Sequence, residues 1–527
     1  MKCVDETTPL SRVVNRLKRG VASGLPKWAG GWRRHPNAVG RRGLSWLEGA
    51  VILARLRARR LFRARDLVTF RELAALAWPI TAGMLGEAAL GLVDTKLVGG
   101  LGAGALAGVG LATVLMYLSY SVVFGLMRGV KVRTAYALGL GRPADGVRYA
   151  QAGLLVGAGV GAVVFVLCRD VTPLLQWLRV DPITIAPARD FLAARTTAAV
   201  ATCALAALIQ HRQGIGDART PMAVGIAGNL VNAALAYGLI HGAWGLPALG
   251  VRGAGYATAS TEVLELVAML ALLGRDTLGQ RGEARLSFRA ALREVLTLGL
   301  PMGLHWGFET LAFTTFNAVL ASLGAAELAA SHLAINTLRA SFLPGVAIGE
   351  AASVLVAAAL ARRRLGEADR VVKLALALAV SFMGLCGVVF GLCGGAIAGA
   401  FTDDPEVARI ASRLFLVAAA FQVLDAVNMV LRCALRGAKD VTWVAVVGTT
   451  VCWTTIPAAA YVFGELAHLG ALGGWLGFLL ETTLGATLMW RRWSRGPFRA
   501  AMGERAPAPV LSLGAASREA TATPTAA

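Results

Sequence analysis

The sequence predicts an all-α polytopic membrane protein in which twelve transmembrane helices form two pseudo-symmetric bundles of six. Three observations lead to this prediction: an apolar composition, basic residues gathered in alternate loops, and an internal repeat. Of the 527 residues, 56% are hydrophobic and only 16% are charged. Soluble domains carry about 25% charged residues, so the composition disfavours a soluble enzyme.

Twelve apolar segments follow one another, and a crossing needs about 20 apolar residues. The loops after the even-numbered segments are basic, whereas the alternate loops are nearly neutral or acidic, as at Asp403 and Asp404. Because cytoplasmic loops carry the excess of Lys and Arg, both termini are expected in the cytoplasm and the chain in the plasma (inner) membrane. The segments span residues 73–98, 105–127, 149–168, 190–210, 221–240, 253–274, 295–322, 328–358, 371–400, 407–431, 441–463 and 470–490.

Residues 1–70 are expected to form a basic cytoplasmic extension. Residues 1–71 hold 17 of the Lys and Arg residues and four acidic ones, which accounts for most of the net charge of +21. An anionic inner leaflet is the partner expected for this charge, and nucleic acid is not. Two structures stay open for the extension: a basic amphipathic helix over Leu44 to Phe62 on the leaflet, or disorder.

The chain repeats itself, because residues 71–148 match residues 293–370 without a gap. Pro79 then falls on Pro301 and Glu87 on Glu309. Each repeat holds an even number of helices, so both enter the membrane in the same orientation, as in transporters built from two bundles around a central site. The predicted domains are an N-lobe (71–275), a cytoplasmic linker (276–294), a C-lobe (295–492) and a flexible cytoplasmic tail (493–527).

Acidic side chains inside the segments are the candidates for function, since burying a charge in the bilayer costs roughly 2.5–3.5 kcal/mol. Glu87 and Asp94 are nearly two helical turns apart and share a helix face. Glu309 and Asp425 lie on different helices of the C-lobe. Such carboxylates could coordinate Na⁺ through oxygen atoms or share a proton.

The alternative for each acid is neutralisation by a basic neighbour, for example Asp425 by Arg432 or Glu350 by Arg339. We favour neutralisation for Glu350 and for Glu481. For Asp94, Glu309 and Asp425 we favour function.

Prolines and aromatic residues near these acids have two interpretations each. Pro79 and Pro301 could act as hinges that close a cavity, or be prolines without a moving role. Trp306, Phe313 and Phe421 could line a pocket for flat cations together with Glu87, or pack between helices. Both alternatives stay open.

Several motifs resemble those of the multidrug and toxic compound extrusion (MATE) family, over roughly residues 71–492. The resemblance implies a V of two six-helix bundles that exports organic, often cationic, compounds as Na⁺ or H⁺ enters, with no cofactor beyond the coupling ion. The motifs are Pro79 with Leu92-Val93-Asp94-Thr95 and Leu101-Gly102-Ala103, Gly214-Ile215-Gly216-Asp217 with Pro221, Gly299-Leu300-Pro301 with Phe308-Glu309, and Leu435-Arg436-Gly437-Ala438-Lys439-Asp440.

The resemblance also assigns roles to residues. The family's acids of helices one, seven and ten fall on Asp94, Glu309 and Asp425. Its cation-site Asn falls on Asn232, and a Thr of helix six matches Thr258. The Asp often found one helical turn after that Asn is Ala236 here, which puts a complete N-lobe site in doubt. We therefore expect coupling, with Na⁺ a candidate ligand, at Glu309 and Asp425, assisted by Asp94.

Two other classes of function would each need residues of a different kind. A flippase of a lipid-linked precursor shares the architecture but needs a basic cavity, whereas the mid-span charges are mostly acidic, with Arg339 the main exception. A membrane enzyme needs a reactive cluster, and the sequence shows neither a His/Cys/Asp cluster nor a phosphate-binding loop. The expected partners are a small organic substrate and membrane lipids, and an oligomer is not required.

Overall fold

The computed structural model describes residues 64–177, 179–279 and 284–500, and residues 66–500 belong to one compact unit. Every element of regular structure in these ranges is a helix. The predicted helix at Leu44 to Phe62, nearly all of the basic extension and most of the C-terminal tail lie outside the described residues.

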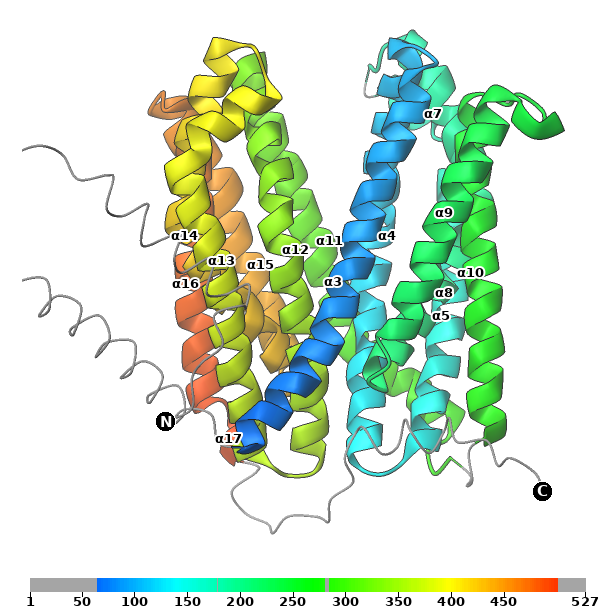
Figure 1. Ribbon diagram of the computed structural model, residues 1–527, viewed down its shortest axis with the longest axis vertical. Coiled ribbons are helices and arrows are strands. Elements are labelled where there is room, and N and C mark those ends of the chain that lie inside the picture. The colour runs from blue at the N-terminus through cyan, green and yellow to red at the C-terminus, as the bar shows by residue number, and fades with distance from the viewer. Residues whose placement is uncertain (1–63, 178, 280–283, 501–527) are drawn as a thin grey trace, which may run out of the picture. The chain divides into compact units, whose positions relative to one another are not determined.

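The N-lobe contains α3 to α10 and the C-lobe α11 to α17 (Figure 1). The N-lobe helices are α3 (Ala64–Gly99), α4 (Ala103–Gly139), α5 (Pro143–Cys168), α6 (Thr172–Trp177), α7 (Pro182–Arg195), η1 (Thr196–Ala198), α8 (Ala199–Gly214), α9 (Arg219–His241), η2 (Ala243–Gly245) and α10 (Val251–Gly279). The C-lobe helices are α11 (Phe288–Leu323), α12 (Ala325–Ala361), α13 (Leu365–Phe401), α14 (Pro405–Gly437), α15 (Val441–Ala459), η3 (Ala460–Leu466), α16 (Gly470–Arg495) and α17 (Pro497–Ala500).

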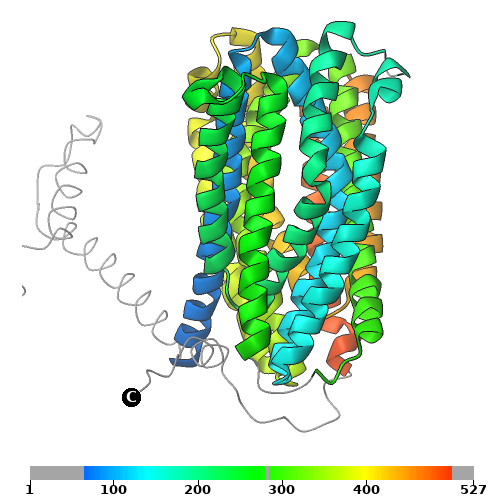
Figure 2. The ribbon, with the colours of Figure 1, turned by 90° about the vertical axis from the view of Figure 1, so that its right-hand side faces the viewer.

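Ten helical spans of the described chain are long and apolar enough to cross a membrane, with α7, η1 and α8 counted as one span and α15 with η3 as another. Helices α11 and α16, of 36 and 26 residues, complete the twelve. The long helices run side by side along the longest axis of the protein (Figure 2). The predicted twelve-helix fold is confirmed.

The same local signals start equivalent helices in the two lobes. Asp181 accepts a hydrogen bond from the backbone N–H of Ile183 at 3.0 Å, and Pro182 opens α7. Asp404 accepts one from Glu406 at 2.9 Å, and Pro405 opens α14. An acidic N-cap satisfies a free helix N–H, and Pro at the first position loses no hydrogen bond there.

The repeat is visible in the backbone. Helices α4 and α12 both have 37 residues, and each begins at the equivalent position of its repeat. The turns that follow contain left-handed residues at equivalent places: Gly141 with φ 70° matches Arg363 with φ 57°, and Gly216 with φ 90° matches Lys439 with φ 64°. The C-lobe thus adopts two turn conformations that favour glycine with Arg363 and Lys439 at the positions of the N-lobe glycines.

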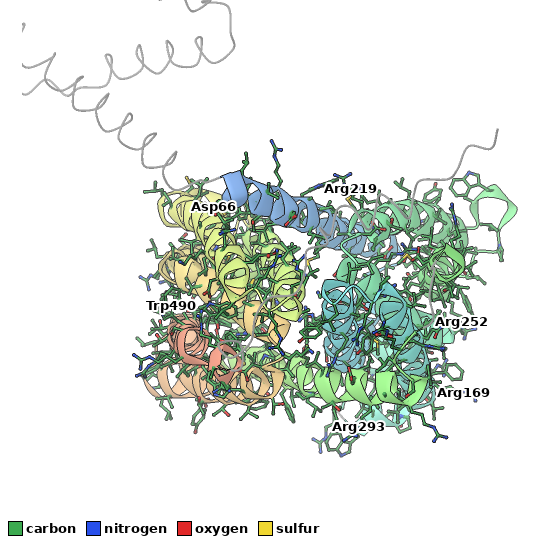
Figure 3. The ribbon with its side chains drawn as sticks, turned by 90° about the horizontal axis from the view of Figure 1, so that it is seen from below. Asp66, Arg169, Arg219, Arg252, Arg293 and Trp490 are labelled. Carbon is green, nitrogen blue, oxygen red and sulfur yellow. The ribbon has the colours of Figure 1, made fainter. Side chains whose placement is uncertain are left out.

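The first helix of each repeat packs against both lobes. The early residues Leu73 and Ile80 of α3 are buried among α12 to α14, whereas Val98, near its end, packs on α9 and α10. Helix α11 does the reverse: Val295 packs among N-lobe helices and Phe316 in the C-lobe core. In the view from below, α3 and α11 lie on opposite sides of the protein, where Asp66 and Arg293 are labelled (Figure 3). Pro79 and Pro301 therefore lie where each helix passes between lobes.

Glycines hold the lobes together at one end. A Cβ atom on Gly125 of α4 would lie 2.7 Å from the Cα of Gly303 of α11. One on Gly129 would lie 3.0 Å from the Cα of Gly299. The α4 and α11 backbones are therefore in direct contact, an approach that only small residues permit.

Candidate functional site

A buried guanidinium shared by two carboxylates forms the centre of the C-lobe. Arg432 of α14 donates from Nη1 to Oε1 of Glu309 on α11 at 2.9 Å, and from Nη2 to Oε1 of Glu481 on α16 at 3.0 Å. The side chains of Arg432, Glu309 and Glu481 are 14%, 27% and 11% exposed. Three helices therefore meet at one charged cluster.

Polar neighbours extend this cluster on either side. The His305 ring lies 3.7 Å from Glu309, measured from Nε2 to Oε2, and its Nδ1 is 3.0 Å from the Thr449 hydroxyl. Asn428 donates to Glu481 at 3.3 Å. The cluster therefore contains hydrogen-bonding groups as well as charges, which is what a buried carboxylate needs in place of water.

Asp425 lies two turns before Arg432 on α14. It forms no hydrogen bond or ion pair with any described residue, although Arg432, Glu481 and Glu309 act on it electrostatically. Asp425 is thus within electrostatic range of Glu309, although no hydrogen bond joins the two carboxylates in the described chain. The alternative in which Arg432 pairs directly with Asp425 is wrong, because Arg432 pairs with Glu309 and Glu481.

The N-lobe contains a second ion pair. Glu262 of α10 accepts a hydrogen bond from Arg195 of α7 at 2.5 Å and another from the Thr202 hydroxyl of α8. Arg195 also acts electrostatically on Asp94, which has no direct partner among the described residues. Neither Glu262 nor Arg195 was predicted as a site residue from the sequence.

The other predicted N-lobe residues lie one helical turn from a packed apolar layer. Val98, Ala236 and Ala254 of α3, α9 and α10 pack together. Asp94 and Asn232 lie four positions before Val98 and Ala236, and Thr258 lies four positions after Ala254. Because α10 runs opposite to α3 and α9, all three residues lie on the same side of that layer. The Asn232 Oδ1 atom is buried without a partner in the described chain, and the Thr258 hydroxyl donates to the Ala254 carbonyl at 3.2 Å.

Glu265 belongs to the same region, although it was not selected as a site residue. Its carboxylate fills the space where a side chain on Gly228 of α9 would lie. Glu87 and Glu262 act on it electrostatically. Its separation from Glu262 could have indicated Glu265 from the sequence, because residues three positions apart lie on one helix face.

A third cluster joins the lobes. Glu350 of α12 pairs with Arg128 at 3.2 Å and with Lys131, both from α4. The Arg128 guanidinium lies 3.6 Å from the centre of the Trp306 ring of α11. The expected neutralisation of Glu350 is confirmed, but its expected partner Arg339 is wrong, because the cations come from the other lobe. Trp306 contacts a protein cation in this conformation.

Two predicted pocket residues belong to packed aromatic contacts. The Phe313 ring stacks on Phe478 with 5.5 Å between centroids, and the Phe421 ring is 6.3 Å from those of Trp475 and Phe478. Phe421 is only 6% exposed. For these two rings the helix-packing alternative describes the structure.

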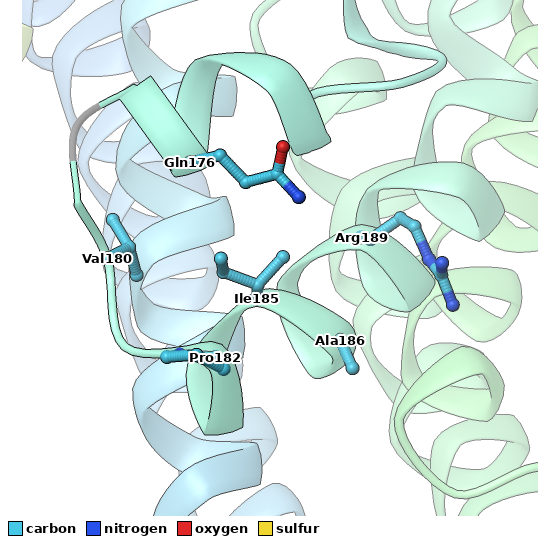
Figure 4. A pocket seen from close by; sticks show the side chains of 6 residues that line it. All are labelled: Gln176, Val180, Pro182, Ile185, Ala186 and Arg189. Carbon is cyan, nitrogen blue, oxygen red and sulfur yellow. The ribbon is translucent and has the colours of Figure 1, made fainter.

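A surface pocket lies elsewhere, at the connection between α6 and α7 (Figure 4). Gln176, Val180, Ile185 and Arg189 are among its lining residues. None of the predicted site residues lines it. We therefore do not assign the pocket to the candidate site.

The basic ends of two helices differ from the prediction. Arg128 and Lys131 were assigned to the loop after the second segment, and Arg432 to the loop after the tenth. The structure continues α4 to Gly139 and α14 to Gly437, so all three residues are helical and buried or nearly so. An apolar segment of the sequence ends at the first charged residues, whereas the helix itself can continue when those charged side chains have buried partners.

Two six-helix bundles related by a repeat, with ion pairs inside each and between them, define a multi-pass membrane transporter. The MatE family model matches the chain twice, over residues 79–238 and 301–460. The two matches begin at Pro79 and Pro301, which are equivalent positions of the internal repeat, and they have the same length.

Known proteins resemble the chain over most of its length. The probable multidrug resistance protein NorM of Burkholderia mallei is 32% identical over 451 residues, 83% of this chain and 94% of that protein. The multidrug resistance protein MdtK of Yersinia pestis is 26% identical over 432 residues, 80% of this chain and 94% of that protein. The crystal structure of the Vibrio cholerae MATE transporter VcmN in the bent form has a TM-score of 0.74 at 18% identity, covering 83% of this chain and 99% of that one. The chain belongs to the MatE family of multidrug efflux transporters.

Proposed function

We propose that the protein is a secondary active antiporter that exports organic cations in exchange for Na⁺ or H⁺. The observation that carries this proposal is the excess of carboxylates over basic groups in the polar region of each lobe. Such an excess attracts cations into a space of low dielectric constant. The N-lobe region holds Glu87, Asp94, Glu262 and Glu265 with Arg195, and the C-lobe region holds Glu309, Asp425 and Glu481 with Arg432 and Arg436.

Coupling is assigned to Glu309 and Asp425, with Asp94 assisting beside Asn232 and Thr258. Cation binding to these carboxylates favours one orientation of the lobes and substrate binding the other. Each inward charge gains about 2.3 kcal/mol per 100 mV of membrane potential, enough to drive a neutral solute uphill about fiftyfold. Export of a monocation for one inward cation is electroneutral and draws on the concentration gradient of the inward cation instead. No cofactor is needed, because the ion gradient supplies the free energy.

The end at which the lobes touch is assigned to the cytoplasm. It carries Arg128, Lys131 and the basic turns that follow α4 and α12, and basic residues face the cytoplasm. The conformation described here is then closed to the cytoplasm, and both termini lie inside. One chain supplies both lobes, so an oligomer is not required.

The acidic excess argues against a flippase for a lipid-linked precursor, whose pyrophosphate needs a basic cavity. Arg432 and Arg195 lie inside the spans, but each is already paired with carboxylates. Arg128 and Lys131 are likewise paired, with Glu350, and Arg339 has an exposed side chain.

The test is efflux of ethidium from liposomes that contain the purified full-length protein, under separate Na⁺ and H⁺ gradients. Asp94→Asn, Glu309→Gln and Asp425→Asn should each abolish export, because each neutralises a coupling carboxylate, while the protein still inserts. Asp403→Asn, in an exposed turn, is the matched control and should export normally. Normal export by all three coupling variants would contradict the assignment, and transport under neither gradient would contradict cation antiport.

A further inference from the structure

Arg432 divides its hydrogen bonds between two acids. One Nη atom donates to Glu309 and the other to Glu481, at 2.9 and 3.0 Å. By contrast, Arg492 gives both of its hydrogen bonds to one carboxylate, that of Asp440, at 2.6 and 3.1 Å. A two-point pair of this kind is the stronger arrangement, so the guanidinium of Arg432 is held less firmly by either acid than that of Arg492.

The cluster also retains unused bonding capacity. Arg432 Nε, His305 Nε2 and Asn428 Oδ1 are buried without a hydrogen-bond partner among the described residues. On Glu309, Oε1 accepts from Arg432, and His305 Nε2 lies 3.7 Å from Oε2, beyond hydrogen-bond distance. Asp425 has no direct partner in the described chain. Carboxylate oxygens are thus available to another cation beside the guanidinium.

We propose that Arg432 is the built-in counter-cation of the C-lobe site, which competes with the transported cation for Glu309 and moves onto Glu481 when that cation binds. The inference rests on the proposed function only in that the competing cation is a transported one. Glu481 then has a distinct role: it holds the guanidinium after Glu309 is taken by the cation. Arg432 and Glu481 are positioning residues that set cation affinity.

Competition predicts opposite effects for the two residues. Arg432→Gln removes the internal competitor, so cations should bind more tightly, by roughly 5- to 150-fold, the usual range for coupled sites. Glu481→Gln leaves Glu309 as the only acid bonded to the guanidinium, so cations should bind more weakly. Because Glu481 acts through Arg432, its substitution should have little effect once Arg432 is absent.

The experiment measures tetraphenylphosphonium affinity by isothermal titration calorimetry on the purified full-length protein, at fixed pH without Na⁺. The variants are Arg432→Gln, Arg432→Lys, Glu481→Gln and the double variant Arg432→Gln with Glu481→Gln. Arg492→Gln is the matched control, because it breaks an ion pair between Asp440, the N-cap residue of α15, and α16, away from the cluster. Arg432→Lys keeps the charge and should stay near the wild-type affinity, and Arg492→Gln should not change it.

Opposite shifts in the two single variants, with no further effect of Glu481→Gln in the absence of Arg432, support the proposal. Shifts in the same direction indicate a structural role and overturn it, as do additive effects in the double variant. If Arg432→Gln does not fold, an unchanged or higher affinity in Glu481→Gln still overturns the proposal.

Failure of the proposed function gives a separate result. A wild-type protein that binds no tetraphenylphosphonium and exports no ethidium contradicts organic-cation export. The same titrations with Na⁺ then test the role of Arg432 alone. Na⁺ binding gained in Arg432→Gln supports competition, and the absence of Na⁺ binding in every variant overturns the competition proposal.

Discussion

Glu350→Gln is expected to shift the protein away from the conformation in which the lobes touch. The Glu350 carboxylate is the common partner of Arg128 at 3.2 Å and of Lys131, and the Glu350 and Lys131 side chains are only 6% and 2% exposed. In the variant both cations would be buried beside a neutral amide. Removing one partner of a buried ion pair costs about 3–5 kcal/mol.

This cost falls on the closed conformation, because separation of the lobes lets Arg128 and Lys131 reach water. At about 1.4 kcal/mol per factor of ten, the closed-to-open ratio should fall by roughly two to three and a half orders of magnitude. The Trp306 ring beside Arg128, and the Gln213 amide oxygen 3.5 Å from Lys131 Nζ, would offset part of the loss. We therefore expect the lower end of that range.

Spin labels at Arg142→Cys and Gly366→Cys would report the separation by double electron–electron resonance, with the seven native cysteines replaced. Both positions lie in or beside the turns that follow α4 and α12. Glu350→Gln should lengthen and broaden the distance distribution. Adding Lys131→Met removes one buried unpaired cation and should restore part of the closed population. An unchanged distribution in Glu350→Gln would refute the reasoning.

Three smaller perturbations complete the predictions. Gly303→Val would place its Cβ 2.5 Å from the Val122 carbonyl oxygen, so it should disfavour the closed conformation by about 1–3 kcal/mol. The same resonance assay measures this shift, and an unchanged distance distribution would contradict the close packing. Trp306→Ala removes the ring beside Arg128 and should shift the same equilibrium by only about 0.5–2 kcal/mol, so an effect larger than that of Glu350→Gln would be inconsistent. Gly216→Ala should destabilise the protein by about 1–2 kcal/mol, because φ is 90° at this position. Gly225→Ala, which is equally free of neighbours but lies inside α9, should stabilise it, because alanine favours the helix. Thermal melting in detergent would show opposite shifts in melting temperature.

The agreement between the expected and observed helices has a local cause. The length of an apolar segment and the charge of the loop beside it are properties of neighbouring residues, so the twelve spans could be predicted one at a time. The repeat could be predicted from the sequence too, since it requires only that two stretches of one chain resemble each other. The acids Asp94, Glu309 and Asp425 stood out because charge is rare in an apolar segment.

Partners could not be predicted in this way. Glu350 was expected to pair with Arg339 of its own helix, but it pairs with Arg128 and Lys131, which belong to the other lobe. Arg432 looked like a loop residue because it follows an apolar run, yet it is helical and paired with acids from two other helices. Sequence distance carries no information on which helices cross.

By itself the sequence determined the fold class, the number of crossings, the repeat and the acids that belong inside the membrane. These follow from composition and periodicity along the chain, which tertiary packing does not alter. Only the tertiary structure decided which cation neutralises which acid, and that α3 and α11 each pack against both lobes. Those outcomes depend on which helices lie side by side: α4 and α11 approach closely at their glycines and bring the lobes together, whereas Arg432 meets acids from α11 and α16 within the C-lobe.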